Sequence, residues 1–136
     1  KDAALADQLM DWQCSTLGSG FFMIFMNKIR VPPEKSSQEQ IMKGEKQTAQ
    51  LLQQLETKLT QNNYLLGNIL TMADIPIGAM LYRYFMMEIK RPPLPAIEAY
   101  YQRLIARPDY QKHVMIPFGR NSDEWLKEEK RNAGLQ

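Results

Sequence analysis

The segment around Thr71 and Asp74 specifies a helix start in full, and no other feature constrains the fold as strongly. Thr71 is expected to cap the helix through its hydroxyl, and Asp74 is expected to reach back to the Thr71 amide. Leu70 and Ile75 flank the pair at the spacing of a hydrophobic staple. Asp74 also brings negative charge to the positive end of the helix dipole. The sequence therefore predicts reciprocal capping by Thr71 and Asp74.

The helix that follows this start is predicted over residues 72–89 and is apolar on every side. Arg83 and Glu88 are the charged residues between Ile75 and Ile89. A helix that is apolar all round must be enclosed by others, so this one is predicted to be the central helix of a helical domain. Its length would also suit a membrane span, but the charged residues within and beside it argue against that alternative.

The rest of the sequence also follows helical patterns, and no long stretch alternates with period two. A first helix is predicted from about Ala3 to Ile29, loosened around Gly18-Ser19-Gly20 and stopped by Pro32-Pro33. Its predicted packing face consists of Leu5, Leu9, Trp12, Thr16 and Met23. The other predicted helices are 37–60, with a buried face of Ile41, Thr48, Leu52, Leu55 and Leu59, then one packing through Ile97, Tyr101 and Leu104, and a short one at 109–115. We expect one all-α domain over residues 1–136, a bundle of five to six helices around the central helix.

Composition and charge narrow the possible partners. The chain has 136 residues and a net charge of +2 with basic and acidic residues mixed, so nothing in it favours nucleic acid or an anionic membrane. Cys14 is the single cysteine and cannot form an internal disulfide, which fits a reducing cytoplasm. His113 has no cluster of metal ligands near it in sequence, so no metal site is expected. Because the first methionine, Met10, already lies in helical pattern, we expect the chain to begin inside a longer polypeptide.

One face of the first helix carries the candidate site. Its members fall at helical spacing and combine a carboxylate, small or hydroxylated residues and an aromatic: Asp11, Ser15, Gly18, Ser19 and Phe22. Small side chains leave room, a carboxylate can pair with an ammonium group, and an aromatic can cover an apolar one. Small residues also let another helix approach closely, and the residues by themselves leave this alternative open.

The chain resembles the C-terminal domain of soluble glutathione transferases, most closely the bacterial theta-like and beta-like members. In that family a Leu-Leu-Gly loop precedes a Thr/Ser-x-x-Asp box and a buried helix. The matching segments occur here in the family's order: Leu9-Met10-Asp11-Trp12-Gln13, Leu65-Leu66-Gly67, the Thr71–Asp74 box, Leu94-Pro95-Ala96-Ile97 and the stretch from Tyr100 to Pro108.

The resemblance implies a function that the residues alone do not. It implies a cytoplasmic, detoxifying transferase that joins glutathione, as co-substrate, to a hydrophobic electrophile and forms a homodimer through its first two helices. Glutathione would be held mainly by a thioredoxin-like N-terminal domain that is absent from this chain, so no catalytic residue is expected here. The face from Asp11 to Phe22 would then line the substrate site, with Asp11 near the partner subunit's glutathione.

A second class of function is compatible with the same features. Similar helical domains serve as non-catalytic protein–protein interaction modules. Ser15, Thr16, Gly18 and Ser19 stand where family members often place charged or ring-bearing residues. The uncharged Gly18 and Ser19 fit such a module as well as they fit a changed substrate.

Overall fold

The computed structural model describes residues 2–135, and all their regular structure is helical, which confirms the all-α fold. An isolated bridge pairs Tyr64 with Gly67 in a loop. In chain order the helices are α1 (Asp2–Trp12), the π-helical turn η1 (Gln13–Leu17), α2 (Gly18–Phe25), a second π-helical turn η2 (Met26–Arg30), the 3₁₀ turn η3 (Pro33–Lys35), α3 (Gln38–Leu59), α4 (Asp74–Met86), α5 (Pro95–Ile105), α6 (Pro108–His113) and α7 (Ser122–Asn132).

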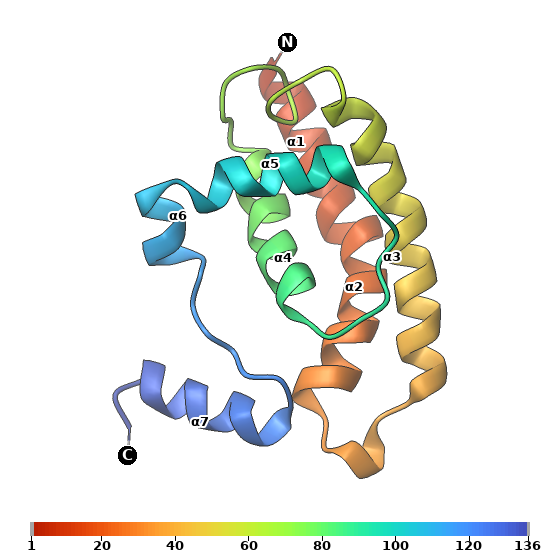
Figure 1. The fold of residues 1–136 in the computed structure, drawn as a ribbon, viewed down its shortest axis with the longest axis vertical. Helices are drawn as coiled ribbons and strands as arrows, with labels where there is room; N and C mark the ends of the chain where they lie inside the picture. The colour runs from red at the N-terminus through yellow and green to blue at the C-terminus, as the bar shows by residue number, and fades with distance from the viewer. Residues whose placement is uncertain (1, 136) are drawn as a thin grey trace.

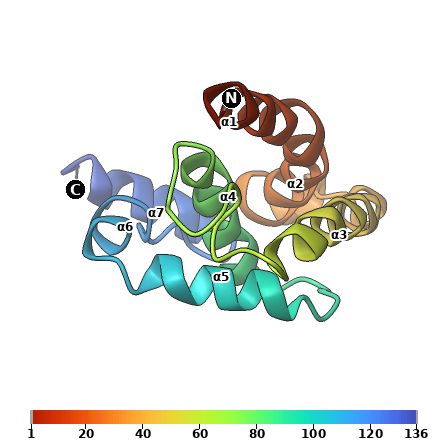
Figure 2. The ribbon, with the colours of Figure 1, turned by 90° about the horizontal axis from the view of Figure 1, so that it is seen from above.

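Helix α4 lies in the middle of the bundle, as predicted. α1 and α2 run along one side of it, α5 crosses it, and α6 and α7 lie on the remaining side (Figures 1 and 2). Ile77 and Leu81 are completely buried. The helix is shorter than the predicted 72–89 and is not enclosed all round, because Ile75 is 57% and Met86 is 56% exposed.

The capping of α4 differs from the predicted reciprocal box. The Asp74 carboxylate accepts a hydrogen bond from the Thr71 amide at 2.7 Å, as the box requires. The Thr71 hydroxyl, however, donates to the same carboxylate at 3.0 Å and does not cap a helix amide. The reason is that Thr71 precedes a turn, in which the Asp74 amide donates to the Thr71 carbonyl, and α4 begins only at Asp74.

Asp74 also joins distant parts of the chain. It is 1% exposed, and its other carboxylate oxygen accepts hydrogen bonds from the Leu65 amide at 3.1 Å and the Tyr100 hydroxyl at 2.9 Å. A buried carboxylate is stable only when its acceptor capacity is used, and here four donors use it. The carboxylate therefore fixes the loop before α4 and the middle of α5 together.

A second buried carboxylate fixes the start of α5. Glu56 on α3 is 7% exposed and accepts from the Ala96 amide at 2.8 Å and the Ile97 amide at 2.9 Å. Pro95 stands at the first turn of α5, and the residue before it gives no side-chain cap. Glu56 thus satisfies free amides that a local capping residue would otherwise serve.

The first helix is continuous from α1 to η2 and contains two π-helical turns. A π turn holds one residue more than an α turn, so it shifts the buried face by one position. Leu17 is fully buried, whereas Thr16, predicted to lie on the packing face, is exposed. The loosened turn predicted at Gly18–Gly20 therefore lies just before these glycines, at Gln13–Leu17.

Aromatic contacts hold α7 against the rest of the bundle. The Phe25 ring packs on Phe118 at 5.7 Å and on Trp125 at 5.6 Å between centroids. The Arg30 guanidinium lies 4.5 Å from the centroid of the Trp125 ring, a cation–π contact. The C-terminal helix is thereby anchored to the second half of the first helix.

Candidate functional site

The five residues of the predicted site all lie along the first helix and outside the bundle core. Asp11, Ser15 and Ser19 are exposed, and Gly18 is half-buried. Phe22 is 61% exposed and presents its ring at the surface. We call this set (Asp11, Ser15, Gly18, Ser19 and Phe22) the Asp11–Phe22 face.

The hydroxyls of this face bond to protein groups. Ser15 donates to the Asp11 carbonyl at 2.7 Å. Ser19 donates to the Thr16 carbonyl at 2.8 Å and accepts from the Gln47 side chain of α3 at 2.7 Å. Each hydroxyl keeps some acceptor capacity for a ligand, but neither donor is free in this arrangement.

Gly18 has a role in the helix backbone itself. Its amide donates to the Gln13 carbonyl, which closes the π turn. A Cβ built on Gly18 would stand 2.8 Å from that carbonyl oxygen, closer than a real Cβ contact allows. The missing side chain at Gly18 is therefore used by η1, and a large residue there would disturb the helix as well as any space beside it.

The close helix approach left open by the sequence is made by other glycines. A Cβ on Gly44 of α3 would lie 2.6 Å from the carbonyl oxygen of Gly20, so the backbones of α2 and α3 nearly touch at this point. Gly20 and Gly44 are both buried. Close packing thus explains Gly20, which lies outside the predicted face, and leaves Ser15 and Ser19 on the surface.

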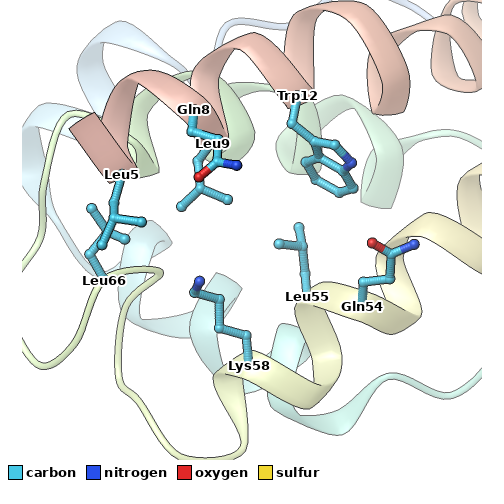
Figure 3. Close-up of a pocket in the computed structure, with 8 residues that line it drawn as sticks. All are labelled: Leu5, Gln8, Leu9, Trp12, Gln54, Leu55, Lys58 and Leu66. Carbon is cyan, nitrogen blue, oxygen red and sulfur yellow. The ribbon is translucent and has the colours of Figure 1, made fainter. Parts of the chain in front are cut away.

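A cleft of about 320 Å³ opens between α1 and the C-terminal part of α3. Figure 3 shows the side chains that line it, which are Leu5, Gln8, Leu9, Trp12, Gln54, Leu55, Lys58 and Leu66. None of the Asp11–Phe22 face is among them. The sequence grouped Leu5, Leu9 and Trp12 as a packing face, and the structure makes them the wall of this cleft; we call it the α1/α3 cleft.

Sequence reasoning missed the polar members of this cleft. The spacing within α3 placed Gln54 and Lys58 off its predicted buried face, and Gln8 was not singled out. The available signal was weak, since Gln8 and Lys58 face each other only across the cleft between two helices that are far apart in the chain. The sequence held a clearer sign of the buried carboxylate Glu56. This charged residue follows Leu55 directly and lies within the apolar face of α3.

The tyrosines whose pKa is perturbed are all poor acids. Burial raises the pKa of Tyr84 to about 12. Burial first, and then the charge and hydrogen bond of Asp74, raise the pKa of Tyr100 well above its ordinary range. These hydroxyls stay protonated at neutral pH and cannot act as bases there.

Three further observations concern the described residues. Within residues 2–135 there is no group of three or more His, Cys, Asp or Glu side chains placed to hold a metal ion. Over the same residues, no helix combines the length and the apolar character that a membrane crossing requires. Cys14 is exposed and carries a free thiol.

The fold defines a class: an all-helical domain around a buried central helix whose start is held by a carboxylate. The family model for the C-terminal domain of glutathione S-transferase matches residues 14–108. The chain belongs to this family.

Two relatives show how far the similarity extends. The chain is 32% identical over 114 residues to the glutathione S-transferase GstB of Escherichia coli K12, covering 84% of this chain and 55% of that protein. It is 38% identical to the theta class glutathione S-transferase of the citrus canker pathogen Xanthomonas axonopodis pv. citri, solved with glutathione bound, with a TM-score of 0.81 over 85% of this chain and 56% of that one. The chain therefore spans about half the length of the relatives it matches.

A third comparison shows the fold alone. The bacterial glutathione S-transferase BphK, solved as a ternary complex, has a TM-score of 0.66 and 23% identity over 93% of this chain and 54% of that one.

Proposed function

We propose that this chain is the substrate-binding half of a glutathione transferase that joins glutathione to hydrophobic electrophiles. The observation that carries the proposal is the similarity to the glutathione-bound theta class enzyme, at 38% identity and a TM-score of 0.81. The part of the protein outside this chain would be a thioredoxin-like domain that binds most of glutathione and activates its thiol. We place the protein in the cytoplasm, in detoxification.

The reaction divides the work between the two domains. The N-terminal domain would stabilise the thiolate, which attacks the electrophilic carbon. The new sulfur–carbon bond forms as the leaving group departs with the electron pair of the bond that breaks. The helical domain contributes position, since holding the electrophile beside the thiolate removes much of the entropic barrier.

The Asp11–Phe22 face is the proposed surface for the electrophile. Its exposure supports this role, because these residues are free to face another domain or a ligand. Phe22 offers an apolar ring, and the small side chains of Ser15 and Ser19 leave room for a ligand above the helix. Asp11 supplies a carboxylate that can pair with the ammonium group of glutathione bound to either subunit.

We also propose that the protein forms a homodimer through its first two helices. These are the continuous helix that runs from α1 to η2, and helix α3. Such an interface would bury more than roughly 1,000 Å² in total. Light scattering on the full-length protein at micromolar concentration tests this proposal. A monomer under these conditions would contradict it.

The experiment for the function is a conjugation assay on the full-length protein, with glutathione and 1-chloro-2,4-dinitrobenzene. We expect conjugation, and we expect Phe22→Ala to raise KM for the apolar electrophile by roughly tenfold, the usual effect of removing apolar contact area. KM for glutathione should stay unchanged. Met42→Ala, which removes another exposed apolar side chain from α3, is the matched control.

One observation favours a non-catalytic interaction module as the second candidate. The hydroxyls of Ser15 and Ser19 donate to backbone carbonyls, so the face offers few free donors to a substrate. A full-length protein that binds glutathione but conjugates no electrophile would support this candidate over the enzyme.

A further inference from the structure

We propose that a pocket at the C-terminal end of α4 binds an apolar dipeptide whose ammonium and carboxylate groups are both free. The pocket has a volume of about 460 Å³ and lies between η2, the N-terminal part of α3 and the connection from α4 to α5. Figure 1 shows this connection passing from the end of α4 towards α3 before it enters α5. The proposal does not depend on transferase activity, and the connection belongs to neither helix of the proposed dimer interface.

Charged residues of both signs line this pocket, which we call the α4-exit pocket. They are Lys28 of η2, Glu45 of α3, and Glu88, Lys90 and Arg91 of the connection. Within residues 2–135 none of the five belongs to an ion pair, since both ion pairs of this part of the chain lie at α7. Acidic and basic groups therefore share one cavity without neutralising one another. A zwitterion carries both charges and can pair with both kinds of group.

The charged side chains are held in place by backbone groups. Lys28 donates through Nζ to the Glu88 carbonyl at 2.6 Å, and Glu45 accepts at Oε1 from the Lys90 amide at 3.1 Å. Arg91 donates through Nη1 to two carbonyls near the end of α4, at 2.7 and 3.1 Å. Each side chain still has capacity for a ligand, because an ammonium has three donors, a carboxylate two oxygens and a guanidinium five donors. Groups fixed in this way lower the ordering cost of binding.

A buried hydroxyl beside the pocket lacks a partner. Tyr84 is 1% exposed, and its hydroxyl forms no hydrogen bond within residues 2–135. The charges of Arg91 and Glu45 act on its pKa in opposite directions, so the hydroxyl lies near both of these pocket residues. A buried donor without an acceptor costs free energy. A ligand that brings an acceptor between Glu45 and Arg91 would remove that cost.

The rest of the pocket surface is partly apolar. Ile41 is 4% exposed and Ile89 is half-buried, whereas Met42 is 60% exposed. A methionine side chain adapts to apolar groups of different shape. The volume lies within the range of ligand pockets, and the apolar surface gives the side chains of a dipeptide a place to pack.

The test uses a set of peptides that differ in charge. Alanyl-leucine carries both charges, N-acetyl-alanyl-leucine carries only the carboxylate, and alanyl-leucinamide carries only the ammonium group. Isothermal titration calorimetry on the full-length protein measures the affinity of each. We expect saturable binding of alanyl-leucine and roughly two- to fivefold weaker binding of each blocked peptide, because each lacks one ion pair. Free leucine should also bind more weakly, because it has less apolar surface.

Two substitutions assign the ends of the peptide. Glu45→Gln removes a charge but keeps an acceptor for the Lys90 amide, so it should weaken alanyl-leucine and alanyl-leucinamide by roughly two- to fivefold and leave the N-acetyl peptide unchanged. Lys28→Gln keeps an N–H donor and should weaken alanyl-leucine and the N-acetyl peptide instead. Glu39→Gln and Lys43→Gln change exposed residues of α3 that do not line the pocket, and these matched controls should leave every affinity unchanged.

Four results would overturn the proposal. The first is no saturable binding of alanyl-leucine, and the second is equal affinity for the blocked peptides or for free leucine. The third is that the control variants weaken binding as much as Glu45→Gln and Lys28→Gln do, which would show an effect of overall charge alone. The fourth is that Met42→Arg converts a dimer to a monomer in light scattering, because a second copy of the chain would then cover the pocket.

Discussion

The start of α4 and the first helix are held in opposite ways. At the start of α4 one buried side chain, Asp74, accepts four hydrogen bonds and joins three segments of the chain. In the first helix the decisive positions, Gly18 and Gly20, act through the side chain they lack. The comparison teaches that a side chain fixes structure by what it bonds, and a glycine by what it allows to come close.

The largest effect is expected where a buried acceptor is lost. Asp74→Ala leaves the Leu65 and Thr71 amides and the Tyr100 hydroxyl without their partner, so it should lower the free energy of unfolding by about 3 kcal/mol or more. Chemical denaturation measures the loss. Asp109→Ala is the control, since Asp109 also lies in the first turn of a helix but is exposed. Equal losses for both variants would show that only the helix dipole matters.

The second prediction concerns the helix contact. Gly44→Ala places a Cβ against the backbone oxygen of Gly20 and should cost about 1–3 kcal/mol of unfolding free energy. Gly20→Ala should cost less, because its Cβ would meet the Thr48 hydroxyl at 2.9 Å and side-chain carbons of Gln47, which can move. Denaturation of both variants gives the order, and the reverse order would contradict this account of the contact.

The third prediction tests the π turn. Gly18→Ala gains helix propensity but brings a Cβ within 2.8 Å of the Gln13 carbonyl oxygen, so a net loss of about 1 kcal/mol is expected. Amide hydrogen exchange should also rise across η1. Ser15→Ala in the same turn should change stability by less than about 0.5 kcal/mol. A more stable Gly18→Ala protein would mean that the turn does not need the glycine.

The last prediction concerns Tyr100, whose contribution to stability changes at alkaline pH. The folded-state pKa of Tyr100 lies above its ordinary value of 10.0, so its contribution to stability is complete below pH 10.0 and falls as the pH rises further, because the unfolded chain ionises first. Tyr100→Phe should be about 1 kcal/mol less stable at neutral pH, since Asp74 loses a donor. Its stability should fall less steeply above pH 10.0 in denaturation series. An unchanged slope would contradict the assignment.

The sequence alone predicted the structure correctly where the pattern lies within a single helix or a short segment. The apolar stripe of α3 predicted five buried positions, Ile41, Thr48, Leu52, Leu55 and Leu59, and all are buried because a regular α-helix keeps its period. The pairing of the Asp74 carboxylate with the Thr71 amide was also legible, since the two residues are three apart. The family resemblance then supplied the arrangement of the helices.

The sequence alone did not predict features that depend on the contact of two helices or on an irregular turn within one helix. The π turn at Gln13–Leu17 inserts one residue into the period, so Leu17 is buried where Thr16 was expected. The α1/α3 cleft needs Gln8 and Lys58 from helices far apart in the chain, and spacing within one helix cannot report that. The role of the Asp11–Phe22 face stays a prediction, because its proposed partner domain lies outside this chain.

The hydrogen bonds from the start of α5 to Glu56 bear on where insertions can be tolerated in the chain. The start of α5 is held by α3 through the Ala96 and Ile97 amides, and its middle is held by Asp74 through Tyr100, so both anchors lie outside the connection that leads from α4. Insertions in the stretch between Met87 and Leu94 can therefore change the length of that connection while the helix it leads to stays in place. A loop made tolerant in this way is a site where related sequences are free to diverge and where a tag can be inserted.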